Sequence, residues 1–102
     1  MTTEAEIVHD HAGHRYTLEV EGLTAVVLYN ETEGGLIITE TLVPPAVEGR
    51  GVASRMARHV LDEIRDRGLL VMPTCPFFAG YIRKHPEYAD IVHPSYRAAL
   101  GL

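Results

Sequence analysis

The sequence is poor in cysteine, in cations and in long apolar runs, and each shortage excludes a class of protein. A single cysteine, Cys75, excludes an internal disulfide and favours a reducing, cytoplasmic environment. No stretch approaches the ~18 apolar residues that cross a membrane. Residues 1–6 also lack the cationic start and apolar run of a signal peptide. We therefore expect a cytoplasmic protein with no membrane partner.

Cations are outnumbered, because nine lysines and arginines face fourteen aspartates and glutamates, giving a net charge of −5. This balance argues against binding to nucleic acid, which requires clustered cations to neutralise phosphates. Eight of the nine cations lie at or after Arg50, and only Arg15 precedes it. An anionic ligand would therefore be bound by the second half of the chain.

The first half of the chain is typical of an antiparallel meander. Residues 14–20 alternate between apolar and polar side chains, and the turn signal Glu21-Gly22 joins them to a second β-rich run. A third run follows, with Leu36, Ile38 and Leu42 expected near one face. The predicted strands are Glu6–His9, His14–Val20, Leu23–Tyr29 and Leu36–Val43, the last ended by Pro44-Pro45.

The period changes after Pro45, where apolar residues begin to recur every four positions. The positions Val52, Met56, Val60 and Ile64 predict an amphipathic helix of about four turns, with Gly68 as its C-cap. The run Leu69–Met72 is short and wholly apolar, which is typical of a strand buried on both faces. A helix at Phe77–Lys84 and a last helical turn or two within Ile91–Leu102 complete the prediction.

Together these elements predict one α+β domain spanning residues 1–102, with no repeats. The sheet is expected to be mixed but mainly antiparallel, with about five strands and two to three helices. The expected order is strand, strand, strand, strand, helix, strand, helix. A sheet edge without a partner in so short a chain makes a monomer and a weak homodimer equally reasonable.

The glycine-containing loop Val47–Ser54 is the strongest candidate for a ligand site. Its glycines allow a ligand to approach the main chain, and the helix that follows begins with N–H groups that have no partner and a positive dipole end. Both features favour phosphate. The loop is neither a Walker loop, which needs Gly-Lys-Ser/Thr, nor a complete Rossmann fingerprint, since Ser54 replaces the third glycine. A plain glycine turn before a helix is the alternative.

Three further segments carry a resemblance to a known family. They are Val43-Pro44-Pro45, Pro73-Thr74-Cys75-Pro76-Phe77 and Tyr81-Ile82-Arg83-Lys84-His85-Pro86-Glu87-Tyr88. With the glycine loop, they resemble the small YjdJ-type or NATD-type GNAT-like N-acetyltransferases over about Tyr16 to Tyr88. Gly51 and Ala53 match the family's Gln/Arg-x-x-Gly-x-Gly/Ala pattern. Glu48 departs from it, because Gln or Arg is usual there.

The resemblance implies a GNAT-like fold that binds acetyl-CoA, used as a co-substrate and without a metal. The strands Leu36–Val43 and Leu69–Met72 would run side by side and then splay apart to hold the pantetheine arm. That arm would pair with main-chain groups near Leu42 and Val43. The pyrophosphate would sit on the N–H groups of Gly49, Arg50, Gly51, Val52, Ala53 and Ser54, with the Arg50 cation beside it.

Several residues are candidates for chemistry, and each has a purely structural alternative. Cys75 begins a helix, a position that favours thiolate, and could accept the acetyl group or form a mixed disulfide with CoA. The alternative is a small buried apolar residue. Glu40 is a candidate general base or an exposed strand carboxylate. The resemblance implies that the hydroxyl of Tyr81 or Tyr88 protonates the leaving thiolate, whereas aromatic residues at this spacing are more often core.

Arg83, Lys84 and His85 either bind the CoA phosphates or cap the C-terminus of their helix. The histidines of His9-Asp10-His11-Ala12-Gly13-His14 raise the idea of metal binding. Alternating positions along a strand would point these side chains apart, so we expect no metal site.

Two functions remain open. One is acetyl transfer from acetyl-CoA to an unidentified primary amine, on a small molecule or a protein lysine, either directly or through acetyl-Cys75. The other is a non-catalytic module that binds or senses CoA or acyl-CoA. A small interaction domain whose ligand site has decayed is a weaker third reading.

Overall fold

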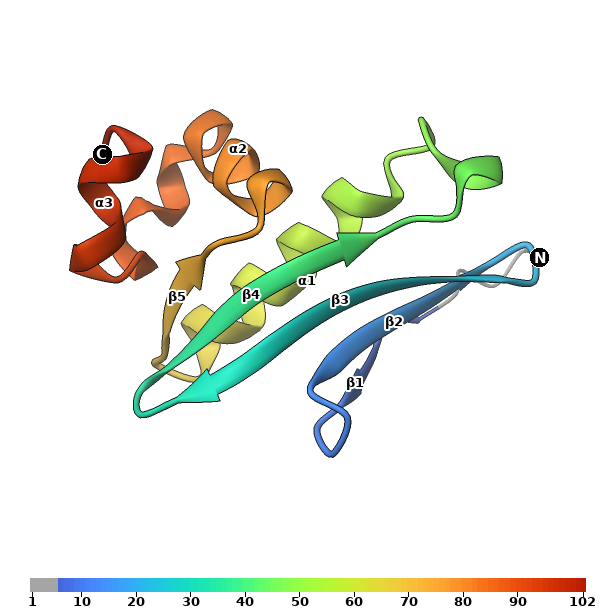
Figure 1. The fold of residues 1–102 in the computed structure, drawn as a ribbon, viewed down its shortest axis with the longest axis horizontal. Coiled ribbons are helices and arrows are strands. Elements are labelled where there is room, and N and C mark those ends of the chain that lie inside the picture. The colour runs from blue at the N-terminus through green and yellow to red at the C-terminus, as the bar shows by residue number, and fades with distance from the viewer. Residues whose placement is uncertain (1–5) are drawn as a thin grey trace.

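The computed structural model describes residues 6–102 and confirms the α+β class, with a five-stranded mixed sheet and three α-helices (Figure 1). Residues 1–5, which belong to the N-terminal segment predicted not to be a signal peptide, lie outside the described residues. The strands are β1 Val8–Asp10, β2 Arg15–Val20, β3 Leu23–Thr32, β4 Gly35–Leu42 and β5 Leu70–Pro73. The helices are α1 Val52–Asp66, α2 Pro76–Lys84 and α3 Pro94–Leu100, with short 3-10 turns η1 Pro45–Val47 and η2 Pro86–Ile91. Among residues 6–102, no helix combines the length and apolarity that crossing a membrane requires.

The strands lie in the sheet in chain order, and only the β4–β5 pair is parallel. This pair is short: it runs from Gly35 opposite Leu70 to Ile38 opposite Pro73. β4 continues to Leu42, whereas β5 ends at Pro73. The two strands therefore part after four paired positions, as the sequence resemblance implied.

A bulge in β4 corrects the predicted face of Leu42. Leu28 lies opposite Glu40, but Tyr29 lies opposite Ile38, so Thr39 is an extra residue in the ladder. An extra residue reverses the alternation of faces beyond it. Leu42 therefore does not share a face with Leu36 and Ile38, and half of its surface is exposed.

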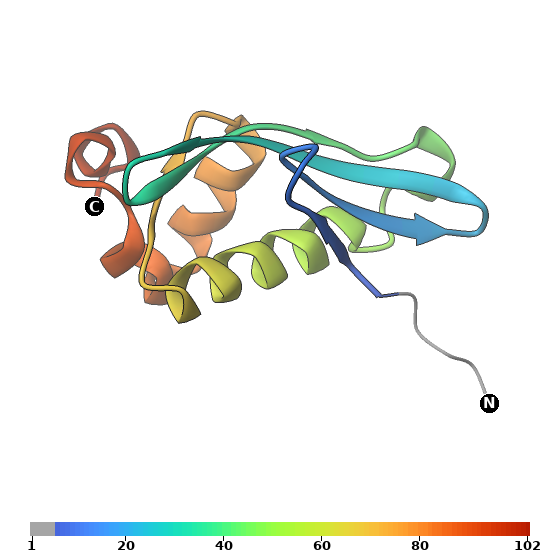
Figure 2. The same ribbon diagram turned by 90° about the horizontal axis from the view of Figure 1, so that it is seen from below.

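The core lies between α1 and one face of the sheet, which we call the inner face (Figure 2). The helix contributes a fully buried stripe, Met56, Ala57, Val60, Leu61 and Ile64, which confirms the predicted amphipathic helix. Figure 2 shows α1 and α2 on this side of the sheet. Leu70 and Met72 are only half-buried on the opposite, outer face. The expectation that this strand is buried on both faces is thus wrong, because no described helix covers the outer face.

Element ends differ from the predicted ones where turns are tighter than their composition suggests. β3 continues to Thr32 and β4 starts at Gly35, because Gly34 takes a φ of 77° and reverses the chain within two residues. The edge strand is Val8–Asp10 rather than Glu6–His9. The C-cap of α1 is Arg67 rather than the predicted Gly68, which follows it with a φ of 69°.

A polar cluster ties the edge strand β1 to helix α1. The Glu63 carboxylate accepts a hydrogen bond from the Tyr16 hydroxyl (2.6 Å) and lies 2.7 Å from His9 Nδ1. His9 Nε2 lies 2.5 Å from the Tyr29 hydroxyl, and the His9 ring stacks on the Tyr16 ring. Since β1 pairs with β2 over only three positions, the bond to Glu63 is a main attachment of this strand.

The same cluster makes stability depend on pH. Burial lowers the pKa of His9 below its ordinary 6.5, although the Glu63 carboxylate acts in the opposite direction. The unfolded chain therefore binds this proton at a higher pH than the folded chain. We expect the free energy of unfolding to fall as the pH drops below about 6.5, with a slope of up to about 1.4 kcal/mol per pH unit.

Urea denaturation between pH 8 and pH 5 would measure this dependence. Replacing His9 with Asn should flatten the profile in this window. His14→Asn is the matched control, because the half-exposed His14 side chain pairs with Glu31 rather than with Glu63, and its effect on the profile should be smaller than that of His9→Asn. An unaltered profile in the His9 variant would contradict the assignment.

Candidate functional site

The chain that follows β5 is fastened to β4 at the point where the two strands part. The Thr74 hydroxyl and the Cys75 N–H both donate to the Ile38 carbonyl, at 2.9 and 3.0 Å. Cys75 precedes the first residue of α2, and its Sγ lies 3.3 Å from the Thr41 hydroxyl. The thiol is 3% exposed. Cys75 is thus held against the part of β4 that has no β5 partner.

The glycine loop shapes the start of α1. Gly49 and Gly51 adopt φ values of 83° and 75°, which strain any other residue, and neither position has a neighbour within 4 Å of an added Cβ. Gly51 precedes the first residue of the helix, and no side chain caps the N–H groups that follow. These N–H groups and the positive end of the helix dipole are available to an anion.

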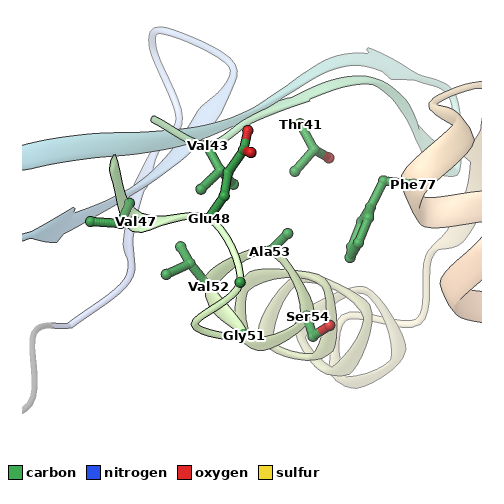
Figure 3. Close-up of a pocket in the computed structure, with 10 residues that line it drawn as sticks. Thr41, Val43, Val47, Glu48, Gly51, Val52, Ala53, Ser54 and Phe77 are labelled. Atoms are coloured by element: carbon green, nitrogen blue, oxygen red, sulfur yellow. The ribbon is translucent and has the colours of Figure 1, made fainter. Parts of the chain in front are cut away.

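A cavity of about 380 Å³ joins this helix start to the end of β4 (Figure 3). Its lining residues come from β4, the loop, α1 and α2: Thr41, Val43, Val47, Glu48, Gly49, Gly51, Val52, Ala53, Ser54 and Phe77. Phe77 faces the helix start from across the cavity. A narrow ligand with a charged end and an apolar or amide-containing arm would match these walls.

The charges of the loop differ from the expectation. The Arg50 guanidinium forms an ion pair with Glu21 in the β2–β3 turn, and Arg50 does not line the cavity. Figure 3 shows the Glu48 side chain turned towards β4, beside Val43 and Thr41. No lysine or arginine is among the lining residues. Main-chain N–H groups are therefore the main attraction for an anion here.

Cations gather instead in two adjoining hollows between α1 and α2, of about 240 and 310 Å³. The predicted residues Lys84 and His85 line them, together with Ser54 of the loop. Arg55 and Arg58 line the second hollow, and sequence reasoning missed both. Their spacing of three residues, directly after the glycine loop, was the signal that could have found them.

Tyr81 and His85 form a stacked pair in these hollows, with ring centroids 3.9 Å apart. His85 Nδ1 lies 2.8 Å from the Tyr81 carbonyl, and this contact of the His85 ring caps the end of α2. Burial raises the pKa of the Tyr81 hydroxyl, so this group stays protonated near neutral pH. Tyr81 can therefore donate a proton. His85 both caps the end of α2 and lines the hollow, so its two predicted roles do not exclude each other.

The remaining candidates point elsewhere. Arg83 donates to the Ala99 carbonyl and joins α2 to α3. The Tyr88 hydroxyl donates to Asp62 at 2.6 Å. Burial and the Asp62 carboxylate raise the pKa of this hydroxyl, so it stays protonated and can donate. Glu40 is exposed and lies opposite Leu28, on the outer face of the sheet, because the bulge turns it away from α1.

The histidines near the N-terminus also correct an expectation. The rings of His9 and His11 do not point apart but stack, with centroids 3.7 Å apart, because the chain leaves β1 after Asp10 and turns back. Both nitrogens of His9 are engaged, by Glu63 and by Tyr29. Within the described part of the chain, no three His, Cys, Asp or Glu side chains form a metal-binding group.

Comparison with known proteins gives a consistent result. The sequence profile of the GCN5-related N-acetyl-transferase family matches residues 15–91. The chain is 28% identical to Protein NATD1 of Gallus gallus over 94 residues, covering 87% of this chain and 86% of the relative. It is also 28% identical to Protein NATD1 of Homo sapiens over 93 residues, covering 86% and 82%. The matched residues include the parted strands, the glycine loop and Cys75.

Proposed function

Because the chain belongs to the GCN5-related N-acetyl-transferase family, we propose that it binds acetyl-CoA in the cavity beside β4 and transfers the acetyl group to a primary amine. The observation that carries this proposal is a single cavity that combines an uncapped helix start with the unpaired end of β4. The first part suits a pyrophosphate. The second suits an amide-containing arm that pairs like an added strand.

Each part of the ligand has a candidate partner. The pyrophosphate would lie on the N–H groups of residues 49–54, and the pantetheine arm would pair with the main chain near Leu42 and Val43. The Phe77 ring would cover the arm. The remaining phosphate would be bound by residues of the adjoining hollows, namely the cations Arg55, Arg58 and Lys84, together with His85. Arg50 would contribute only after leaving Glu21.

Two routes for acetyl transfer are proposed, and the direct one requires the amine to arrive from the outer face, where Glu40 lies. Acetyl-CoA supplies an activated acyl group whose carbonyl carbon accepts a nucleophile. In the direct route the amine nitrogen attacks that carbon, Glu40 accepts the amine proton, and Tyr81 protonates the departing thiolate. In the two-step route the Cys75 thiolate attacks the acetyl carbon, the C–S bond to CoA breaks and CoA leaves as the thiolate. The amine then attacks acetyl-Cys75, the new C–S bond breaks, and the amine proton passes to the departing Cys75 sulfur.

Titration calorimetry with acetyl-CoA tests binding, and release of the CoA thiol in the presence of amines tests transfer. No heat and no thermal stabilisation at millimolar acetyl-CoA would refute the proposal. Replacing Cys75 with Ala separates the two routes. Full turnover in this variant would exclude the two-step route, whereas the two-step route predicts a loss of at least about 100-fold with binding retained.

A non-catalytic CoA-binding or acyl-sensing module is the second candidate. The observations that favour it are the nearly complete burial of Cys75 and the exposure of Glu40, which leave no prepared base beside the thiol among the described residues. Binding of acetyl-CoA without thiol release, against a broad set of amines, would select this function over the enzyme.

Replacing Glu48 with Gln is expected to strengthen acetyl-CoA binding by about three- to tenfold at low salt, because it removes a like charge near the pyrophosphate. The gain should shrink as salt is added. Calorimetry at two salt concentrations measures both effects, and Glu33→Gln, in the β3–β4 turn, is the control. Equal or weaker binding by the Glu48 variant would contradict a pyrophosphate at this loop.

A further inference from the structure

The outer face of the sheet is a broad surface that no described helix covers (Figure 2). Side chains that point to this face are half-buried or exposed, in contrast to the fully buried inner set. Glu40 lies on it, opposite Leu28. Strand register also places on it the apolar residues Val8, Val26, Leu28, Ile37, Leu42, Leu70 and Met72. Apolar residues with a polar surround are typical of a surface that binds another macromolecule.

This face continues into the proposed cofactor cavity. A shallow hollow of about 430 Å³ is lined by Thr24 and Leu42 of the outer face. It shares Thr41, Val43 and Glu48 with the lining of the cavity. β4 and β5 part after Ile38 and Pro73, three residues before Thr41 along β4. A ligand group that crosses this part of the sheet would therefore pass from the outer face to the neighbourhood of Thr41.

The charge of the outer face selects a cationic partner. The Arg15 guanidinium on this face forms an ion pair with Asp10, and Glu19 accepts a hydrogen bond from Thr24. Asp10, Glu19 and Glu40 against Arg15 leave a net charge of −2 on the described face. Glu40 is the carboxylate closest along β4 to the point where the strands part. An ammonium group would be attracted to this position.

We infer that the amine acceptor is a lysine side chain of another polypeptide, which lies across the outer face and presents its amine beside Glu40. This inference rests on the proposed function. Transfer forms a bond between the lysine nitrogen and the acetyl carbon while the thioester C–S bond breaks. The lysine reacts as the neutral amine, after its ammonium form has released one proton to solvent. A second proton passes to Glu40 as the amide forms, and CoA leaves as the thiolate.

A polypeptide fits this face better than a small molecule. Sites for small ligands are concave and bury most of the ligand's surface. The outer face instead offers scattered apolar side chains on a twisted sheet, with a shallow hollow at the end of β4. An extended peptide can contact several of these side chains at once and still extend one lysine towards Glu40.

The test compares synthetic 15-residue peptides carrying one lysine with free lysine and spermidine as acceptors. Mass spectrometry and thiol release measure acetylation. Leu28→Lys places a cation directly opposite Glu40, and Thr17→Lys adds one to the same face at a polar position that tolerates it. We expect either variant to raise the KM for peptide by about tenfold through like-charge repulsion. The Kd for acetyl-CoA should not change in either variant, which separates this effect from a disturbed fold.

Asp66→Lys, on the exposed side of α1, is the matched control and should leave the KM for peptide unchanged. The inference is overturned if free lysine or spermidine is acetylated more efficiently than every peptide. It is also overturned if both outer-face variants keep the wild-type KM for peptide. Sedimentation that shows a dimer disrupted by Thr17→Lys would assign the face to a second copy instead. Absence of acetyl-CoA binding would refute the proposed function itself, which distinguishes the two failures.

Discussion

Replacing Glu63 with Ala is expected to destabilise the protein by about 3 kcal/mol, which lowers the melting temperature by about 15 °C. The Glu63 carboxylate accepts a hydrogen bond from the Tyr16 hydroxyl at 2.6 Å and lies 2.7 Å from His9 Nδ1. Tyr16 is fully buried, and the His9 side chain is 9% exposed. Removing the acceptor leaves both donors desolvated and unpaired, which costs far more than the loss of an exposed ion pair.

The Glu63→Ala substitution should also change how the free energy of unfolding depends on pH. Burial alone would raise the pKa of Glu63, but hydrogen bonding from Tyr16 and the nearby His9 outweigh it, so its pKa lies below the usual 4.5. The stabilisation by Glu63 is therefore present above about pH 4.5 and is lost as the pH falls further. Urea denaturation of Glu63→Ala should show little acid dependence in that range. Asp66→Ala, on the exposed side of the same helix, is the control, and a loss below about 1 kcal/mol in Glu63→Ala would contradict the account.

Replacing Ser54 with Glu is expected to weaken acetyl-CoA binding by about 30-fold without destabilising the fold. Ser54 lines the cavity and both cationic hollows. A carboxylate at the third residue of α1 would repel the pyrophosphate, yet it would interact favourably with the positive end of the helix dipole. Binding and stability should therefore change in opposite directions.

Calorimetry and thermal denaturation of the same samples measure these two effects. Ser54→Gln is the matched control, because it has the same size without the charge and should retain most of the affinity. If Ser54→Glu binds acetyl-CoA as tightly as Ser54→Gln, the phosphates do not lie at the start of α1. A melting temperature well below that of Ser54→Gln would indicate instead that the substitution disturbs the helix.

Periodicity and local turn signals were sufficient for most of the fold. The four-residue recurrence from Val52 to Ile64 predicted α1, because a helix of this length needs one apolar stripe to bury against a sheet. Glu21-Gly22 and Pro44-Pro45 marked the ends of strands through backbone preferences that do not depend on distant residues. The parallel β4–β5 pair and its parting came from the family resemblance, since no local pattern specifies which strands pair.

The candidate site divides in the same way. The sequence by itself determined the glycine loop at the start of α1, because positive φ angles and uncapped N–H groups are local properties of a few consecutive residues. Only the tertiary structure decided where the side chains around it point. The bulge at Thr39 turned Glu40 and Leu42 to the outer face, and the β2–β3 turn brought Glu21 to Arg50. Burial of Cys75 against Thr41, and the joining of His9 to Glu63, likewise arise from contacts between residues far apart in the chain, which spacing along the sequence does not encode.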